Sequence, residues 1–264
     1  MDEPLPDHCR CLVSAAATGP SPSPGSSWVP DGVPCPDSFV LVYDLARPTL
    51  RFCRIRGGDG ARWVSQTYDL GLHEVPGKEP TQRAIGDMAA VQGAFFYLES
   101  RDALGGLVVS LADGPEPRLE PVTFHASLPK LARDAEQTVT KAYLLESDKR
   151  LFLVCLFFIG CTLERIEDVG AYVFDFTEEE WCRVSDIGDA AFLLGPGGFA
   201  ASCPAARHGL KRGCVYFAWD FLGDGNDVDF HIFDLKEGTR EVARPNQDIP
   251  ALNIEPFWLV PVLP

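Results

Sequence analysis

Basic residues are scarce in this sequence, and no apolar run is long enough to cross a bilayer. The chain has 23 Lys and Arg against 38 Asp and Glu, which gives it a net charge of −15. Nucleic-acid binding depends on Lys and Arg that neutralise phosphates, so this balance argues against a nucleic-acid partner. It argues equally against an anionic membrane surface. The longest apolar run, Leu151 to Ile159, is far shorter than the roughly 20 residues of a membrane-spanning helix. Its length is typical of a strand that is buried on both faces.

The motifs that indicate catalysis or a bound metal are missing as well. None of the five histidines belongs to an H-x-H or H-E-x-x-H pattern, and no G-x-S-x-G nucleophile elbow occurs. Residues 195–198 (GPGG) lack the G-K-[ST] ending of a phosphate-binding loop, so a turn is expected there. Residues 224–229 (DGNDVD) lack the glycine and glutamate of a calcium loop. The sequence therefore predicts no enzyme activity, no cofactor, and no catalytic, cofactor-binding or metal-binding residues.

The cysteines do not form a zinc or disulfide pattern. There are nine of them, an odd number with irregular spacing, and no C-x-x-C pair. Several lie in or beside strand-like runs, where free cysteines act as small core hydrophobes: Cys53, Cys155, Cys161, Cys182 and Cys214. Reduced thiols indicate a reducing compartment, and the acidic start MDEPLPDHCRC does not resemble a secretory signal or a transit peptide. The expected localisation is cytoplasmic or nuclear.

The chain changes character near residue 38. Residues 1–37 are rich in Pro, Ser and Gly without an apolar period, so they predict a disordered leader, and residues 38–264 predict one folded domain. In that domain, short apolar runs alternate with Gly, Asp and Pro turns, which is typical of an all-β fold. Residues 127–137 are the one helical pattern. The expected strands are FVLVYDL, LRFCRI, AFFYLES, LVVSL, KAYLLES, LFLVCLFFI, AYVFDF, WCRVSDI, CVYFAW, FHIFDL and TREVAR.

One pattern recurs four times along the domain. A few strand residues end in Asp or Ser, and an apolar residue and a turn follow. The end residues are Asp44, Ser110, Asp175 and Asp234, with spacings of 66, 65 and 59 residues. Repeats of this kind, each a small antiparallel sheet, are typical of a β-propeller. A short oxygen acceptor at a strand end can bind the backbone N–H groups of the next turn. The run after each turn (LRFCRI, EWCRVSDI or TREVAR) is predicted to be the outer, more polar strand of its blade.

The segment from residue 180 to 220 resembles the plant F-box-associated propeller family, which was first catalogued as domain of unknown function 295 and is kelch-like in architecture. Its hallmarks are a Trp-containing strand, an Ile-Gly-Asp turn, a Phe-Leu-Gly strand, a Ser, a Gly-x-Lys segment and a Cys-x-Tyr-Phe strand. They correspond to Trp181, residues 187–189, residues 192–195, Ser202, residues 209–211 and residues 214–217. An earlier Ile-Gly-Asp turn at residues 85–87 also leads to an aromatic strand. The resemblance covers roughly residues 39 to 261.

Full members of that family begin with an F-box, a short helical module that docks an adaptor of the SCF ubiquitin ligase. The Pro-rich stretch before Phe39 has no room for three helices, so we expect no SCF adaptor among the partners. The repeats give about four blades, at the low end of the four to eight that propellers have. We therefore expect a propeller that is incomplete or open relative to the family.

The resemblance implies a non-catalytic protein-interaction module, similar to the substrate-recognition propeller of plant F-box proteins but without the F-box. Its partner would be a protein of unknown identity, and the sequence does not indicate the partner-binding residues. The alternatives are a propeller enzyme and a truncated copy without independent function. The basic segment HGLKRG, residues 208–213, is either a loop that offsets nearby acids or a contact loop on a propeller face.

Overall fold

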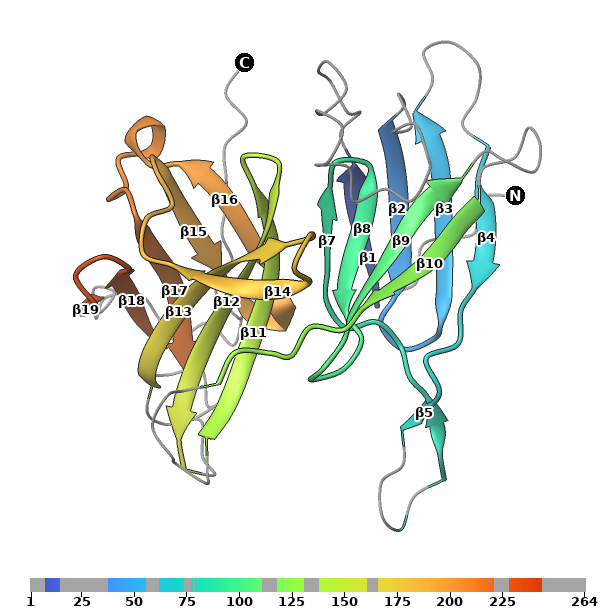
Figure 1. Ribbon diagram of the computed structural model, residues 1–264, viewed down its shortest axis with the longest axis horizontal. Helices are drawn as coiled ribbons and strands as arrows, with labels where there is room; N and C mark the ends of the chain where they lie inside the picture. The colour runs from blue at the N-terminus through green and yellow to red at the C-terminus, as the bar shows by residue number, and fades with distance from the viewer. Residues whose placement is uncertain are drawn as a thin grey trace. The chain divides into compact units, whose positions relative to one another are not determined.

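The computed structural model describes residues 8–14, 38–55, 62–73, 77, 79–110, 118–130, 138–160, 166–220 and 228–243 (Figure 1). Their regular structure is strand, apart from two short 3₁₀ turns, η1 (Pro196–Gly198) and η2 (Ala206–His208). Over these ranges, no helix has the length and apolar character needed to cross a membrane. The chain divides into two compact units. Unit 1 comprises Met1–Ser127 and Phe176–Glu180, and unit 2 comprises Leu128–Asp175 and Trp181–Pro264.

Unit 1 contains two four-stranded antiparallel sheets. The first has the order β1-β2-β3-β4, with β1 (Cys9–Ser14), β2 (Ser38–Asp44), β3 (Thr49–Ile55) and β4 (Val64–Thr67). The second has the order β10-β9-β8-β7, with β7 (Met88–Val91), β8 (Ala94–Leu98), β9 (Leu104–Ser110) and β10 (Arg118–Phe124). A small hairpin of β5 (Leu72–His73) and β6 (Thr81–Gln82) extends beyond the larger strands of this unit in Figure 1.

The two sheets of unit 1 bury their apolar faces against one another. Alternate residues of a strand point to opposite faces, and one face of each sheet supplies this core. The first sheet contributes Phe39, Leu41 and Phe52, and the second contributes Phe95 and Leu107. Each of the first four is 0% exposed, so neither sheet needs to bury this face against anything else.

Unit 2 also contains two sheets. The first has the order β11-β12-β13-β14, with β11 (Thr138–Ser147), β12 (Arg150–Ile159), β13 (Ile166–Asp175) and β14 (Glu180–Val184). The second has the order β16-β15-β17-β18-β19, with β15 (Ala190–Leu194), β16 (Ala200–Pro204), β17 (Cys214–Asp220), β18 (Val228–Asp234) and β19 (Thr239–Ala243). Strands β15 and β17 are parallel, and the other strand pairs whose register is described in this unit are antiparallel.

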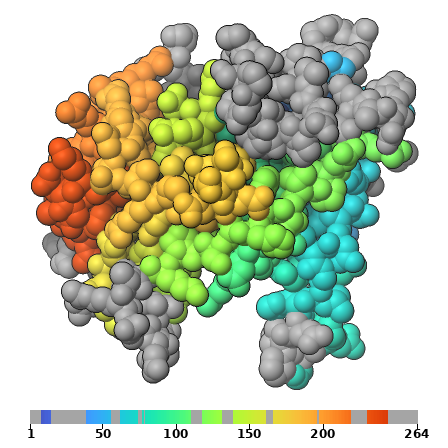
Figure 2. All heavy atoms as spheres, in the orientation of Figure 1, coloured from blue at the N-terminus to red at the C-terminus, as the bar shows by residue number. Residues whose placement is uncertain are grey.

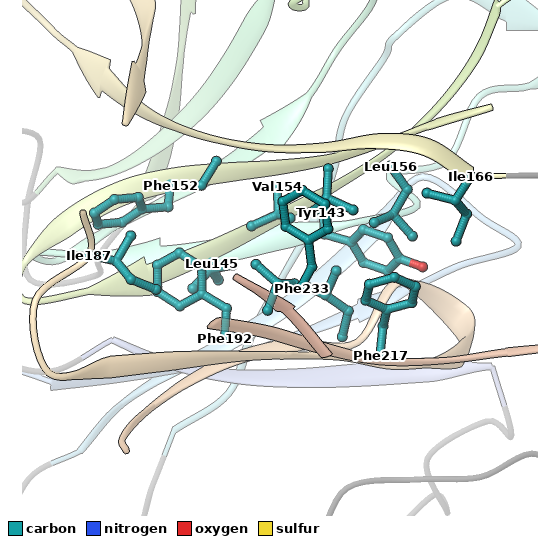
Figure 3. Close-up of a cluster of buried hydrophobic side chains, with 14 of the residues drawn as sticks. Tyr143, Leu145, Phe152, Val154, Leu156, Ile166, Ile187, Phe192, Phe217 and Phe233 are labelled. Atoms are coloured by element: carbon teal, nitrogen blue, oxygen red, sulfur yellow. The ribbon is translucent and has the colours of Figure 1, made fainter. Parts of the chain in front are cut away.

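Figure 3 shows the core of unit 2, in which side chains from the two sheets meet in one layer. Phe152 from β12 lies against Phe192 from β15, with the ring centroids 5.2 Å apart in an edge-to-face arrangement. Val154, Phe158 and Val215 in the same cluster are 0% exposed. Strand β12 is buried at eight consecutive residues. This agrees with the expectation that Leu151 to Ile159 is a strand with both faces buried.

The predicted all-β fold with four repeated sheets is confirmed. Each of the eleven expected strands overlaps a strand of the structure, and the four recurring Asp or Ser residues each end a strand. Asp44 ends β2, Ser110 ends β9, Asp175 ends β13 and Asp234 ends β18, and each of these strands pairs with the strand that follows it.

The expected side-chain contact at the strand ends is present at the first and last of these positions. Asp44 Oδ1 accepts the N–H groups of Ala46 and Arg47 at 2.8 and 3.2 Å. Asp234 Oδ1 accepts those of Lys236 and Glu237, both at 2.9 Å. The acceptor and the two donors have the same spacing in both turns, two and three residues apart. The recurring sequence pattern therefore corresponds to a recurring turn.

Three expectations differ from the structure. Strand β1 lies within residues 1–37, for which the composition predicts a leader, and it pairs with β2 along its whole length; residues 1–7 and 15–37 lie outside the described residues. The run LRFCRI forms β3, which is not an outer strand because β4 pairs with its far side and Phe52 is buried. Residues 127–130 are not helical, and residues 131–137 lie outside the described ranges.

The turn between β13 and β14 belongs to unit 1. The Phe176 ring contacts those of Phe96 and Phe124, with centroid distances of 5.3 and 5.6 Å. Glu179 Oε2 accepts the backbone N–H of His125 at 3.2 Å. Glu179 has a φ of 53°, which is uncommon for a residue with a side chain. Aromatic packing and one hydrogen bond therefore hold this turn within unit 1.

Candidate interaction surface

One face of the first sheet carries apolar side chains that remain accessible. Val13 on β1 lies opposite Val40 on β2, which lies opposite Cys53 on β3. Directly opposed residues of an antiparallel pair project from the same face, and residues two apart in a strand share a face. The resulting surface, which we call the open face, consists of Cys11, Val13, Val40, Val42, Arg51, Cys53 and Ile55.

The open face is the reverse of the face that forms the core of unit 1. Val13 is 58% exposed and Ile55 is 48% exposed, whereas Val42 and Cys53 on the same face are 4% and 3% exposed, so this face is accessible only in part. Cys11 is an exposed thiol. Arg51 is half-buried and is the one charged member. A partner could bury branched aliphatic side chains here, and such burial is the dominant favourable term in most protein association.

The basic segment that the sequence singles out lies on the second sheet of unit 2. Lys211 Nζ contacts both carboxylate oxygens of Glu241 on β19, at 2.6 and 2.7 Å. This carboxylate is the main reason why the pKa of Lys211 is raised. The Lys211 backbone N–H donates to the Tyr216 hydroxyl at 2.7 Å. Of the two interpretations of HGLKRG, this geometry favours the loop that offsets a nearby acid, because Glu241 already engages the Lys211 ammonium.

Burial raises the pKa of several thiols and phenols in the described part of the chain. The pKa of Cys155 rises to about 12, and the pKa values of Tyr97 and Tyr172 also rise to about 12. Desolvation also raises the pKa values of the Cys203 and Cys214 thiols. A thiolate is the nucleophilic and metal-binding form of cysteine, so burial disfavours the reactive form of Cys155, Cys203 and Cys214. Of the five cysteines expected to act as core residues, Cys53, Cys155 and Cys214 are buried, Cys182 is half-buried and Cys161 lies outside the described residues.

The remaining sequence motifs lie in a turn, in a strand or outside the described residues. Within the described ranges, no group of three or more His, Cys, Asp or Glu side chains is arranged to hold a metal ion. Residues 196–198 of GPGG form η1, with Gly197 and Gly198 at positive φ, so the expected turn is confirmed. His231 is 2% exposed and stacks on Phe217 at 4.9 Å. Residues 224–227 of DGNDVD lie outside the described residues.

The sequence did not indicate the open face. Val13 falls in the segment whose composition predicts a leader, and Ile55 falls in a run that is predicted to be an outer strand. Alternation in CRCLVS was the available signal, since Cys11 and Val13 share one face while Leu12 packs against the core. A strand pattern shows which residues share a face, but it does not show how far each side chain on that face is exposed in the folded chain.

Comparison with known proteins gives one match. Neither the curated proteins nor the solved structures contain a significant match to the chain. The family model described as the KIB1-4 beta-propeller matches residues 28–239, which is more than half of the 264 residues. The match spans nearly all of the strands described above, and the four large sheets correspond to four blades, within the range of four to eight that propellers have. The chain therefore belongs to the KIB1-4 β-propeller family.

Proposed function

We propose that this chain is a non-catalytic protein-interaction module that binds a protein partner through the open face. Within this proposal, it is related to the kelch-like, F-box-associated propellers of plants catalogued as domain of unknown function 295. It would bind a protein partner as the substrate-recognition propeller of those proteins does, without recruiting the SCF adaptor. It would work in a reducing compartment, the cytoplasm or the nucleus, because its described cysteines are free thiols.

The observation that carries the proposal is the pair of exposed aliphatic residues on the open face. Val13 and Ile55 lie on two strands that flank β2, and both are about half exposed. A single exposed aliphatic residue is ordinary. Two on one face of a sheet, together with the exposed Cys11 thiol on the same face, favour an interaction site. Arg51 gives the surface a polar group beside them, as interfaces with an apolar centre commonly have.

The charge of the chain bears on which proteins would bind. With a net charge of −15, its long-range field attracts basic proteins and repels acidic ones. Such steering acts mainly on the association rate and weakens as salt rises. We therefore propose a partner with a basic surface around an apolar contact. Its association should slow as ionic strength increases.

The test is affinity purification from tissue that expresses the protein, with the wild type and two variants. Val13→Asp combined with Ile55→Asp places two charges on the open face. Val242→Asp is the matched control, because Val242 on β19 (red in Figure 2) is 47% exposed and belongs to unit 2. A partner that binds the wild type and the control, but not the open-face variant, supports the proposal. Equal recovery with all three proteins contradicts it.

Two accompanying measurements separate the proposal from its alternatives. Circular dichroism and thermal unfolding should show that both variants are folded, since the substituted side chains are already accessible to water. A soluble wild type with a cooperative thermal transition argues against a truncated copy without independent function. Recovery of the SCF adaptor with the full chain would contradict the part of the proposal that excludes ligase recruitment.

A further inference from the structure

The loop that leads into β17 lies over an apolar face of the second sheet of unit 2. Alternate residues of this sheet enter the unit 2 core, and the intervening ones form a separate cluster on the opposite face. The cluster consists of Ala191, Leu193, Cys203, Ala205, Cys214 and Tyr216, with Leu210 and Ile232 packed against it. Leu210 comes from the loop itself, residues 209–213 with the sequence GLKRG, which we call the strap. The strap is therefore part of the cover of this face.

The middle of the strap, Lys211 and Arg212, is fastened to the sheet through side chains. Lys211 is hydrogen-bonded to Tyr216 and Glu241, as described above. The Cys214 thiol donates to the Arg212 carbonyl oxygen at 3.6 Å. Glu241 lies opposite Ile232 on the neighbouring strand, so Lys211 reaches across the clustered face to the edge of the sheet. Among the described residues, no backbone-to-backbone hydrogen bond joins Lys211 or Arg212 to the sheet.

Each end of the strap is a glycine in the left-handed region. Gly209 has a φ of 68° and Gly213 has a φ of 73°, and no atom lies within 4 Å of a Cβ built on either residue. Glycine turns through these conformations with little steric cost. Both ends are anchored by backbone bonds, with Leu210 N–H donating to the Ala205 carbonyl and Gly213 N–H to the Ala190 carbonyl, each at 2.9 Å. Lifting Leu210, Lys211 and Arg212 from the sheet breaks the backbone bond between Leu210 and Ala205, but it breaks no strand pair.

We propose that the strap is a hinged cover that opens while the sheet beneath it stays folded, and that the Lys211–Glu241 ion pair controls how often it opens. Opening removes Leu210 from the cluster and exposes the Cys214 thiol, which is 1% exposed when the strap is closed. Segments held by few buried contacts open far more readily than the whole fold. The Lys211 and Glu241 side chains are 57% and 64% exposed, so salt screens their attraction and loosens the strap.

The test is native-state thiol labelling of the full chain at mildly alkaline pH, with the rate at each cysteine read by peptide mass spectrometry. Cys214 reports strap opening, and Cys155, which is 0% exposed in β12, reports global unfolding. We expect Cys214 to label well before Cys155 in the wild type. Glu241→Gln should raise the Cys214 rate by about two- to five-fold, the range expected for loss of an exposed ion pair, and leave the Cys155 rate nearly unchanged.

Two controls separate the ion pair from a general charge effect. Glu237→Gln removes the same charge from the turn before β19, where its backbone N–H and not its carboxylate is held by Asp234. It should leave the Cys214 rate unchanged. The charge exchange Lys211→Glu with Glu241→Lys should restore the slow rate. High salt should accelerate Cys214 labelling in the wild type and have little effect on Glu241→Gln.

Two outcomes would overturn the inference. If Cys214 and Cys155 label at one common rate in every variant, the strap opens only with global unfolding. If Glu241→Gln and Glu237→Gln behave alike, the ion pair does not control the strap. Neither outcome touches the open face, which lies on another sheet in unit 1, so this inference and the proposed function can fail independently.

Discussion

At the scale of single residues, two glycines in strands make room for tyrosine rings. Tyr97 on β8 lies opposite Gly105 on β9, and a Cβ on Gly105 would overlap the Tyr97 ring. Gly170 on β13 has the same relation to Tyr172, which stands two residues further along its own strand. Glycine usually weakens a strand. Here the ring covers the bare backbone and replaces the packing that the missing side chain would have provided.

Gly105→Ala should destabilise the protein by about 1–3 kcal/mol, the usual cost of inserting a methyl group into a packed core. Tyr97 is 3% exposed within the unit 1 core, so its ring has little space into which it can move. The measurement is the urea midpoint of unfolding. Gly86→Ala is the matched control, because no atom lies within 4 Å of its added Cβ. Equal midpoints for the two variants would contradict this account of Gly105.

At the scale of elements, the strand with its terminal aspartate and turn is the unit that recurs. In both turns with the described contact, one carboxylate oxygen holds two successive N–H groups and closes the turn before the next strand begins. Gly238 completes the later turn by donating its N–H to the Asp234 carbonyl oxygen at 2.9 Å. Because these contacts are local in sequence, the repeat can be recognised from the order of the amino acids alone.

Asp234→Ala should cost about 1 kcal/mol, because two turn N–H groups lose their acceptor in a partly exposed site. Asp234→Asn keeps an acceptor oxygen of the same reach and should remain close to the wild type. Asp44→Ala should cost a similar amount in unit 1. Chemical denaturation of the four proteins checks the order. An Asn variant as unstable as the Ala variant would mean that the charge matters, and not the hydrogen bonds.

The limits of the sequence are also clearest at this scale. The expected strands were found because apolar alternation and turn residues are local signals. Strand β1 was missed because it pairs with β2 across residues 15–37, whose composition predicts a leader. The prediction that β3 is an outer strand was wrong because β4, Val64–Thr67, pairs with its far side. The open face was missed for a related reason, since the exposure of Val13 and Ile55 is set by tertiary packing, which local strand patterns do not encode.

At the scale of the whole molecule, each unit has its own core, and each unit buries groups that stay neutral to a higher pH when the chain is folded. Tyr97 contributes to the core of unit 1, and Cys155 and Tyr172 lie in buried strands of unit 2. Burial raises their pKa values to about 12, from 10.0 for the tyrosines and 9.0 for the cysteine. The folded state therefore binds these protons more tightly than the unfolded chain does.

The stability of the protein should fall as pH rises from about 9 toward 12. Linkage sets the sign: a folded-state pKa above the unfolded value contributes stability that is complete below the unfolded pKa and is lost as pH rises through the folded one. Urea unfolding between pH 8 and 11 measures this loss, at high salt to screen the general repulsion of a chain with net charge −15. Cys155→Ala should show a shallower decline with pH. A flat profile, or one that the substitution leaves unchanged, would contradict this assignment.

The parallel pair in the second sheet of unit 2 has a consequence for biosynthesis. Most strands pair with the strand that precedes them in the sequence, so they can form hairpins one after another as the chain leaves the ribosome. Strand β17 instead adds beside β15 after β16 and η2 have been completed. Until β17 has been synthesised, one edge of β15, whose sequence is AAFLL, has no strand partner. Unpaired apolar edges recruit other chains, so this interval is when a nascent chain most needs chaperone protection.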